Sequence, residues 1–261
     1  MAYQNAHQNA HQNAHQNAHQ KAIAFARENG LFNQLEGIYA QVPHCDGCIG
    51  CKTCCAESVD TTYIEFLYVL NCYYPDYQDL LSLPDDMQKR LLKFTLFELS
   101  IPQKCPFLNE DGCCEVYEAR PLACRVYGTM SRSDYEANYR AVIRQNLHLG
   151  QMLQKEKGFM PHRALMMRKI PFCEHVSVTT QTTTAMRTAW QNELVNLDGK
   201  LYFESLMSMA RLNGHLAGHF FIEDGILERL PEDLITSLRI GILEALQNQY
   251  NDPALQINNG E

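Results

Sequence analysis

Residues 45–55, CDGCIGCKTCC, hold five of the 11 cysteines in the chain, and this stretch decides the kind of fold that we expect. The five are Cys45, Cys48, Cys51, Cys54 and Cys55. Two residues between successive cysteines let a tight turn aim both sulfurs at one point, so the series can supply several corners of a tetrahedral site or a cubane cluster. Gly47 and Gly50 let the backbone fold close to a metal. The stretch therefore predicts a loop around a metal or iron–sulfur centre.

The adjacent pair Cys54 and Cys55 argues against structural disulfides. Neighbouring Cα atoms lie about 3.8 Å apart, whereas a disulfide usually needs about 4.4–6.8 Å. Dense cysteine in a reducing compartment more often indicates metal binding or catalysis, and the odd total points the same way. We expect one of the pair to ligate and the other to pack or to serve a second metal.

A second cysteine-rich loop spans residues 102–128. Its cysteines are Cys105, Cys113, Cys114 and Cys124. Thiolates hold zinc or iron because the metal stabilises the deprotonated sulfur, and ligands that meet only after folding make metal binding part of the folding energy. Arg120 and Arg125 flank Cys124, and as cofactor-binding residues they would offset the negative charge of clustered thiolates. A structural or surface ion pair is the alternative role of these arginines.

Taken together, the two loops resemble the YkgJ-type cysteine-cluster family, which is associated with zinc or iron chelation. The matching residues are Cys48, Cys51, Cys54, Cys55, Cys105, Cys114, Tyr117, Arg120, Pro121, Cys124 and Arg125. Cys45 and Cys113 are additional to the family pattern. The resemblance covers about residues 45–128 and implies a chelated metal centre, while residues 129–261 inherit nothing from it. A more distant similarity to the flagellin lysine methylases would imply a protein-modifying activity.

Other potential ligands are weaker. Cys173 and His175 form a Cys-x-His pair that could add a ligand, although nothing fixes its distance from the two loops. Cys72 lies in an apolar segment, which favours a place in the core. His215 and His219 are four residues apart but lack the Glu of the zinc-protease motif, so packing or capping is the favoured role.

Zinc and iron–sulfur clusters both accept four cysteines, so the ligand type leaves both metals open. The serial spacing is shared with ferredoxins, and adjacent cysteines are uncommon in structural zinc sites, which favours [4Fe–4S].

The composition is that of a folded globular protein, with 46% apolar and 20% charged residues. No apolar run is long enough to predict a membrane span or a signal peptide, so we expect a cytoplasmic protein. Residues 120–170 carry 10 basic and 3 acidic side chains within a chain of net charge −8. That basic segment could receive an anionic partner or offset thiolate charge, while the acidic total argues against a general nucleic-acid binder.

The chain divides into three expected regions. Residues 1–20 carry a His repeat, interpreted as a disordered tail or tag, 21–175 form the cysteine-cluster domain, and 176–261 form a helical region. Helices are predicted over 21–40 with a break at Gly30, from Thr62 to Tyr73, over 85–99, 131–157, 184–218 and 231–250. The fold class is mainly α, with irregular cysteine-rich loops converging on one centre.

Three functions fit these observations. The first is a metal-binding protein whose centre is structural, regulatory or electron-carrying. The second is a cluster-dependent enzyme that modifies a protein substrate, as in the flagellin lysine methylases, although the chain shows neither a glycine-rich nucleotide loop nor a defensible Ser/His/Asp arrangement. The third is metal storage or delivery.

Overall fold

The structure is a computed structural model, and it describes residues 18–43, 55, 59–97, 104–157, 166–167, 172–174, 180–204, 206–207 and 214–220. In these ranges the chain is mainly helical, which confirms the mainly α part of the predicted fold class. The longer helices are α2 (Ala18–Glu28), α3 (Leu31–Tyr39), α4 (Tyr63–Tyr73), α5 (Asp85–Phe97), α7 (Arg132–Lys157) and α9 (Thr184–Phe203). Two short helices, α6 (Leu122–Val126) and α10 (Leu216–His219), complete the α-helical part described, and 3₁₀-helices cover Leu80–Ser82, Tyr117–Ala119 and Tyr127–Thr129.

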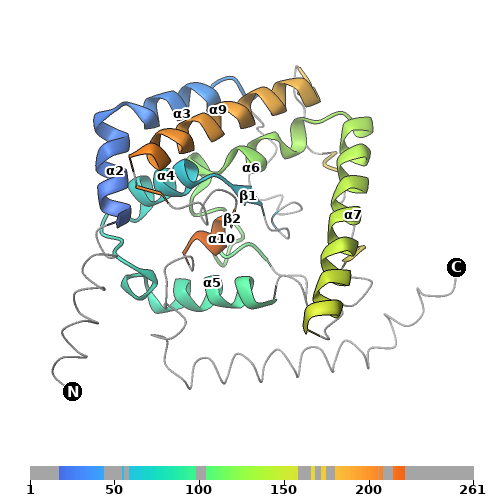
Figure 1. Cartoon of the computed structure of the whole chain (residues 1–261), viewed down its shortest axis with the longest axis horizontal. Coiled ribbons are helices and arrows are strands. Elements are labelled where there is room, and N and C mark those ends of the chain that lie inside the picture. The colour runs from blue at the N-terminus through green and yellow to red at the C-terminus, as the bar shows by residue number, and fades with distance from the viewer. Residues whose placement is uncertain are drawn as a thin grey trace, which may run out of the picture.

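Helix α4 lies at the centre of the core. Helices α2, α3, α9 and α10 all contact it, as Figure 1 shows. Its buried side chains include Ile64, Phe66, Leu67 and Leu70, all with 0% of their surface exposed. Burying such side chains stabilises a fold by about 1.5–3 kcal/mol each, so α4 supplies a large share of the core.

The break predicted at Gly30 is confirmed. Gly30 has a φ of 65° and separates α2 from α3. This left-handed conformation costs glycine little because it has no Cβ. The two helices can therefore turn against each other while both pack on α4.

The start of α2 corrects the predicted tail. Ala18, His19 and Gln20 are helical, so the described fold begins before the boundary expected after residue 20, while residues 1–17 lie outside the described residues. His19 is 1% exposed, and its Nδ1 lies 2.8 Å from the hydroxyl of Tyr63. The last histidine of the repeat thus belongs to the core because α2 packs it against α4.

A two-residue sheet joins distant parts of the chain. Strand β1 (Asp60–Thr61) pairs antiparallel with β2 (Gly214–His215), with Asp60 opposite His215. Just after β2, His219 is 1% exposed and its Nε2 lies 2.9 Å from the carbonyl oxygen of Thr61. The packing role predicted for His219 is therefore confirmed.

The helix predicted over 184–218 is shorter than expected. Helix α9 ends at Phe203, and the chain reaches β2 and α10 within the predicted range. Trp190 and Leu194 of α9 belong to the same hydrophobic core as α2 to α5. The core thus includes residues from both sides of the domain boundary expected at residue 175. The helix predicted over 231–250 lies outside the described residues.

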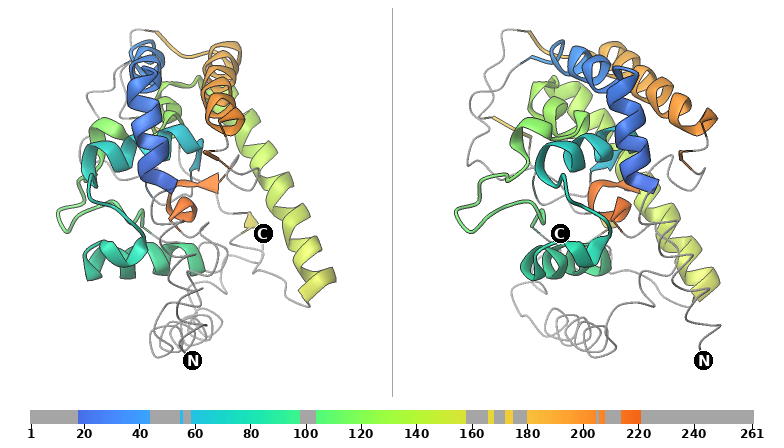
Figure 2. Two further views of the ribbon diagram at one scale, coloured as in Figure 1. Left: turned by 60° about the vertical axis from the view of Figure 1, so that its left-hand side comes forward. Right: turned by 90° about the vertical axis from the view of Figure 1, so that its left-hand side faces the viewer.

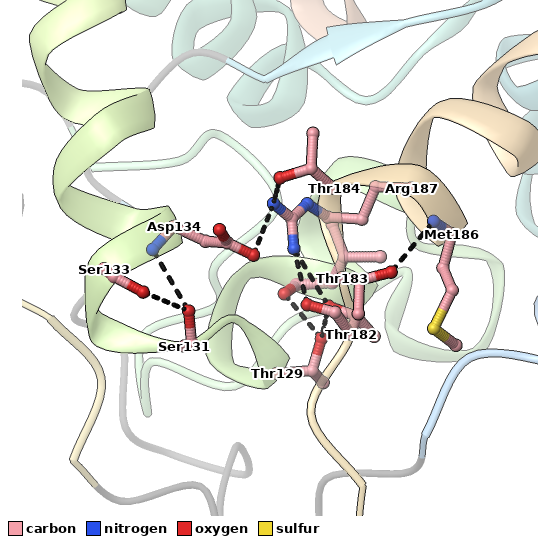
Figure 3. A network of polar contacts seen from close by, with 10 residues as sticks. Thr129, Ser131, Ser133, Asp134, Thr182, Thr183, Thr184, Met186 and Arg187 are labelled. Carbon is pink, nitrogen blue, oxygen red and sulfur yellow. Dashed lines mark hydrogen bonds and ion pairs between the residues drawn. The ribbon is translucent and has the colours of Figure 1, made fainter.

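Helix α7 lies along one side of the molecule (Figures 1 and 2). A polar network joins the start of α7 to the start of α9 (Figure 3). Figure 3 shows Arg187 at the centre of this network, donating to the carbonyl oxygen of Thr182 at 2.7 Å and to Asp134 at 3.3 Å. The hydroxyl groups of Thr182 and Thr129 lie 2.9 Å apart. These contacts fix the loop before α9 onto the residues that precede α7.

Among the described helices, none combines the length and apolar content that crossing a membrane requires.

Candidate metal centre

The described residues contain part of the predicted ligand set. Cys45, Cys48, Cys51 and Cys54 lie outside them, as does His175. The described candidates are Cys55, Cys105, Cys113, Cys114, Cys124 and Cys173.

Cys55 and Cys105 meet through their backbones. The amide of Cys105 donates to the carbonyl oxygen of Cys55 at 2.6 Å. This bond joins the first cysteine-rich loop to the second across 49 intervening residues of sequence, counted between positions 55 and 105. The two loops therefore converge, at least at these two cysteines.

Cys105 and Cys114 lie on the two arms of a tight turn. Leu108 pairs with Cys114 in an antiparallel bridge, and the amide of Glu115 donates to the carbonyl oxygen of Phe107 at 2.7 Å. Gly112 closes the turn with a φ of 76°, which glycine adopts without steric cost.

An arginine of α5 holds this turn in place. Arg90 donates to the carbonyl oxygens of Pro106 at 2.6 Å and Leu108 at 3.0 Å, and it pairs with Glu115 at 3.3 Å. No sequence pattern signals this role, because Arg90 lies in a helix that only its apolar residues make predictable.

The fourth converging cysteine is Cys124, on α6. Burial raises the pKa of its thiol well above the usual value, and the nearby Cys105, Cys114 and Cys55 raise it further. Burial likewise raises the pKa of Cys105 to about 12, with further increases from Cys55 and Cys114. Each of these four sulfurs is therefore close enough to at least one other to oppose its ionisation. A metal cation at this place would reverse that balance by stabilising the thiolates.

The donor chemistry fits zinc or an iron–sulfur cluster, since four sulfurs are the set that both accept. In the part of the chain that the structure describes, no group of three Cys, His, Asp or Glu side chains stands in position to hold a metal ion. Cys55, Cys105, Cys114 and Cys124 thus lie in one region, but the described side chains do not complete a coordination site.

The remaining described candidates are Cys113 and Cys173. Cys113 is exposed, whereas its neighbour Cys114 packs against the hydrophobic core. Cys173 follows Phe172, whose ring lies 4.7 Å from the guanidinium of Arg132 at the start of α7. Its other neighbour, Glu174, pairs with Arg132 at 2.8 Å.

The two predicted cofactor-binding arginines make different contacts. Arg120 is 8% exposed, its guanidinium lies 4.0 Å from the ring centre of Tyr117, and its charge lowers the pKa of Cys124. Arg125 stacks 3.9 Å from the ring centre of Tyr39 and donates to the carbonyl oxygens of Arg120, at 2.8 Å, and of Glu118. Arg120 therefore acts electrostatically on Cys124, a candidate ligand. Arg125 holds the backbone before α6 through its hydrogen bonds to two carbonyl oxygens.

The prediction that Cys72 lies in the core is wrong. Cys72 is exposed near the end of α4, where Asn71 beside it bonds to Arg27 at 2.6 Å. Helix α4 buries the neighbouring turn instead, through Val69 and Leu70.

Comparison with known families agrees with the resemblance seen in the sequence. Residues 44–142 match the family model CxxCxxCC, described as a "putative zinc- or iron-chelating domain". The YkgJ-type resemblance is confirmed. The CxxCxxCC domain so defined runs from the first cysteine-rich loop into α7, and it includes α4, α5 and α6. Searches among curated proteins and among solved structures each gave no match.

Proposed function

We propose that the chain is a metal-binding protein whose cysteine-rich loops jointly hold one zinc or iron–sulfur centre. The observation that carries the proposal is the convergence of Cys55, Cys105, Cys114 and Cys124 from three separate parts of the chain. The family description, zinc or iron chelation, supports the same reading. Cys48, Cys51 and Cys54 are further proposed ligands, Cys45, Cys113 and Cys173 stay predicted candidates, and one centre would take four cysteines from this larger set.

Between the two metals we favour [4Fe–4S]. The serial spacing of the first cysteines is shared with ferredoxin loops, and an adjacent pair such as Cys54 and Cys55 is uncommon in structural zinc sites. Arg120 would serve as the nearby positive charge for a thiolate-rich centre, since it lies close enough to lower the pKa of Cys124. We place the protein in the cytoplasm, where thiols stay reduced.

Metal analysis of the anaerobic protein tests the proposal. The chain is purified under argon, with residues 1–17 removed so that the His repeat contributes no metal, and iron, zinc and acid-labile sulfide are measured per chain. A [4Fe–4S] centre gives about four iron and four sulfide with broad visible absorption. Stoichiometric zinc without iron would refute the cluster and retain the metal centre, whereas neither metal would refute both.

A matched pair of variants tests the ligand assignment. Cys124→Ser removes a converging thiol and should lower metal content by at least half, because a missing ligand leaves the coordination incomplete. Cys72→Ser changes an exposed thiol of the same chain and should leave the metal content unchanged. Equal loss in both variants would show that the metal binds elsewhere or adventitiously.

The two other functions considered from sequence stay predictions. Calorimetric titration with S-adenosylmethionine separates the enzyme from the pure binding protein, since a binding module without that cosubstrate site should give no heat. The division into regions 21–175 and 176–261 also stays a prediction.

A further inference from the structure

The buried carboxylate of Glu65 connects the core helix α4 to the helix that carries Cys124. Glu65 is 2% exposed and lies in the first turn of α4. Its Oε2 accepts bonds from the amide and the hydroxyl of Thr62, at 3.0 and 2.8 Å. Its Oε1 accepts from the amide of Leu122 at 2.6 Å, and Leu122 is the first residue of α6. One side chain thus fixes the starts of two helices that are distant in sequence.

A second connection reaches the other side of Cys124. The hydroxyl of Tyr39, on α3, donates to Oε1 of Glu65 at 3.1 Å. The guanidinium of Arg125 lies 3.9 Å from the centre of the Tyr39 ring. Glu65 and Tyr39 therefore hold the chain two residues before Cys124 and one residue after it.

The same carboxylate also holds the residue that follows β1. Thr62 comes directly after β1 and caps α4, with Glu65 as its partner. Glu65 thus joins the end of β1 and the start of α4 to the helix that carries Cys124. We propose that Glu65 is a positioning residue that sets the placement of Cys124 relative to the other ligands. This inference rests on the proposed metal centre.

Chemistry explains why glutamate suits this position. Four donors converge on Glu65, and a carboxylate accepts from all of them because both of its oxygens carry lone pairs. A glutamine of the same shape has one oxygen and one NH₂ group, so it would leave the donors on one side facing another donor. Glu65→Gln therefore disturbs either the Thr62 end or the Leu122 end of the connection with little change in volume.

Asp198 provides a matched control. It is a second buried carboxylate at the start of α4, where its oxygens accept from the amides of Tyr63 at 3.0 Å and Ile64 at 2.7 Å. Among the hydrogen bonds described, those of Asp198 join α9 to α4 and leave α6 out. Asp198→Asn therefore imposes the same kind of defect on the core without acting on the Cys124 segment.

The test measures metal affinity in the full chain. Metal-free, reduced wild type, Glu65→Gln and Asp198→Asn are titrated with Co²⁺, followed by the thiolate charge-transfer bands, and zinc affinity is then measured by competition. We expect Glu65→Gln to weaken zinc binding about 10-fold or more and to change the Co²⁺ spectrum, in line with other groups that orient metal ligands. Asp198→Asn should keep the wild-type spectrum, with an affinity within about twofold, and equal losses in both variants would overturn the proposal.

Tyr39→Phe gives a second route if Glu65→Gln fails to fold. It removes one donor to Glu65 and keeps the aromatic ring beneath Arg125, so a smaller weakening of zinc binding is expected. Wild-type spectra and affinity in folded Glu65→Gln or, where that variant does not fold, in Tyr39→Phe would overturn the positioning role while leaving the metal centre intact. A wild-type protein that gives neither thiolate–Co²⁺ bands nor an iron–sulfur cluster would instead refute the metal centre itself, and the positioning role with it.

Discussion

Asp198 makes the stability of the core depend on pH. The side chain is fully buried, with 0% exposed, and both oxygens accept amide bonds at the start of α4. Burial raises its pKa from 3.8 to about 7, outweighing the two hydrogen bonds that lower it, and nearby Glu65 adds to the increase. Because the folded pKa is raised, the contribution of this group to stability is complete below about pH 4 and is lost as pH rises through about 7.

The size of the effect follows from the shift. Moving the pKa of Asp198 from 3.8 to about 7 corresponds to about 4 kcal/mol, of which more than half falls between pH 5 and pH 8. Asp198→Asn removes this dependence because the amide stays neutral. It also loses one acceptor, which costs about 1–3 kcal/mol at every pH. The variant should thus have a lower free energy of unfolding than wild type in acid. This difference should shrink as pH rises, because only wild type loses stability.

Urea unfolding followed by circular dichroism, at intervals from about pH 5 to pH 8, measures the effect as a difference between the two proteins. Titration of the cysteines and any metal linkage contribute equally to both proteins and cancel in that difference. A difference that stays flat over this range would refute the argument that burial controls this carboxylate. If the free energy of unfolding of wild type instead rises relative to that of the variant with pH, the amides and the helix dipole of α4 control the pKa of Asp198.

Two further predictions concern packing and the polar network. His19→Ala should lower the free energy of unfolding by about 2–4 kcal/mol, because it empties a buried site and removes the bond to Tyr63. Lys21 is exposed, so its control variant Lys21→Ala should change the free energy of unfolding by less than about 0.5 kcal/mol. Arg187→Ala should cost about 1–3 kcal/mol through its lost bonds to Thr182 and Asp134, and Arg140→Ala, on the exposed surface of α7, serves as its control. Urea unfolding at constant pH measures all four variants, and equal effects within either pair would contradict the assigned contacts.

Helix starts with side-chain or glycine signals were predictable from the sequence. The start of α4 at Thr62 and the break at Gly30 were predicted correctly. Thr62 and Glu65 form a capping box, and Gly30 adopts a left-handed conformation between α2 and α3. These signals are local, since the capping side chain satisfies amides within three residues of itself. The end of α9 has no such signal. The chain leaves the helix after Phe203 and returns Gly214 to a strand beside Thr61, a pairing that depends on residues far apart in sequence.

The wrong prediction that Cys72 lies in the core also has a physical cause. Residues 63–73 are apolar at nearly every position, and their periodicity therefore does not distinguish the face that packs from the face that meets solvent. Neighbouring helices decide it, since α2, α3, α9 and α10 contact α4. For the candidate metal centre, the cysteine spacing predicted that the two loops converge, and the bond between Cys105 and Cys55 agrees with this at those two residues. The spacing contained no information on Arg90 or on the bond from the amide of Leu122 to Glu65.

The start of α4 therefore connects the core to the candidate metal centre. Glu65 reaches α6 and Asp198 comes from α9, and the two carboxylates are near enough for Glu65 to raise the pKa of Asp198. The bond from the amide of Leu122 to Glu65 forms only when α6 is docked, and Cys124 is two residues further along that helix. If the metal holds Cys124 in place, it must also favour this bond, because both constrain the same short helix. Metal loading should accordingly slow hydrogen exchange at the amide of Leu122 more than at Ile64, whose amide bonds to Asp198 instead.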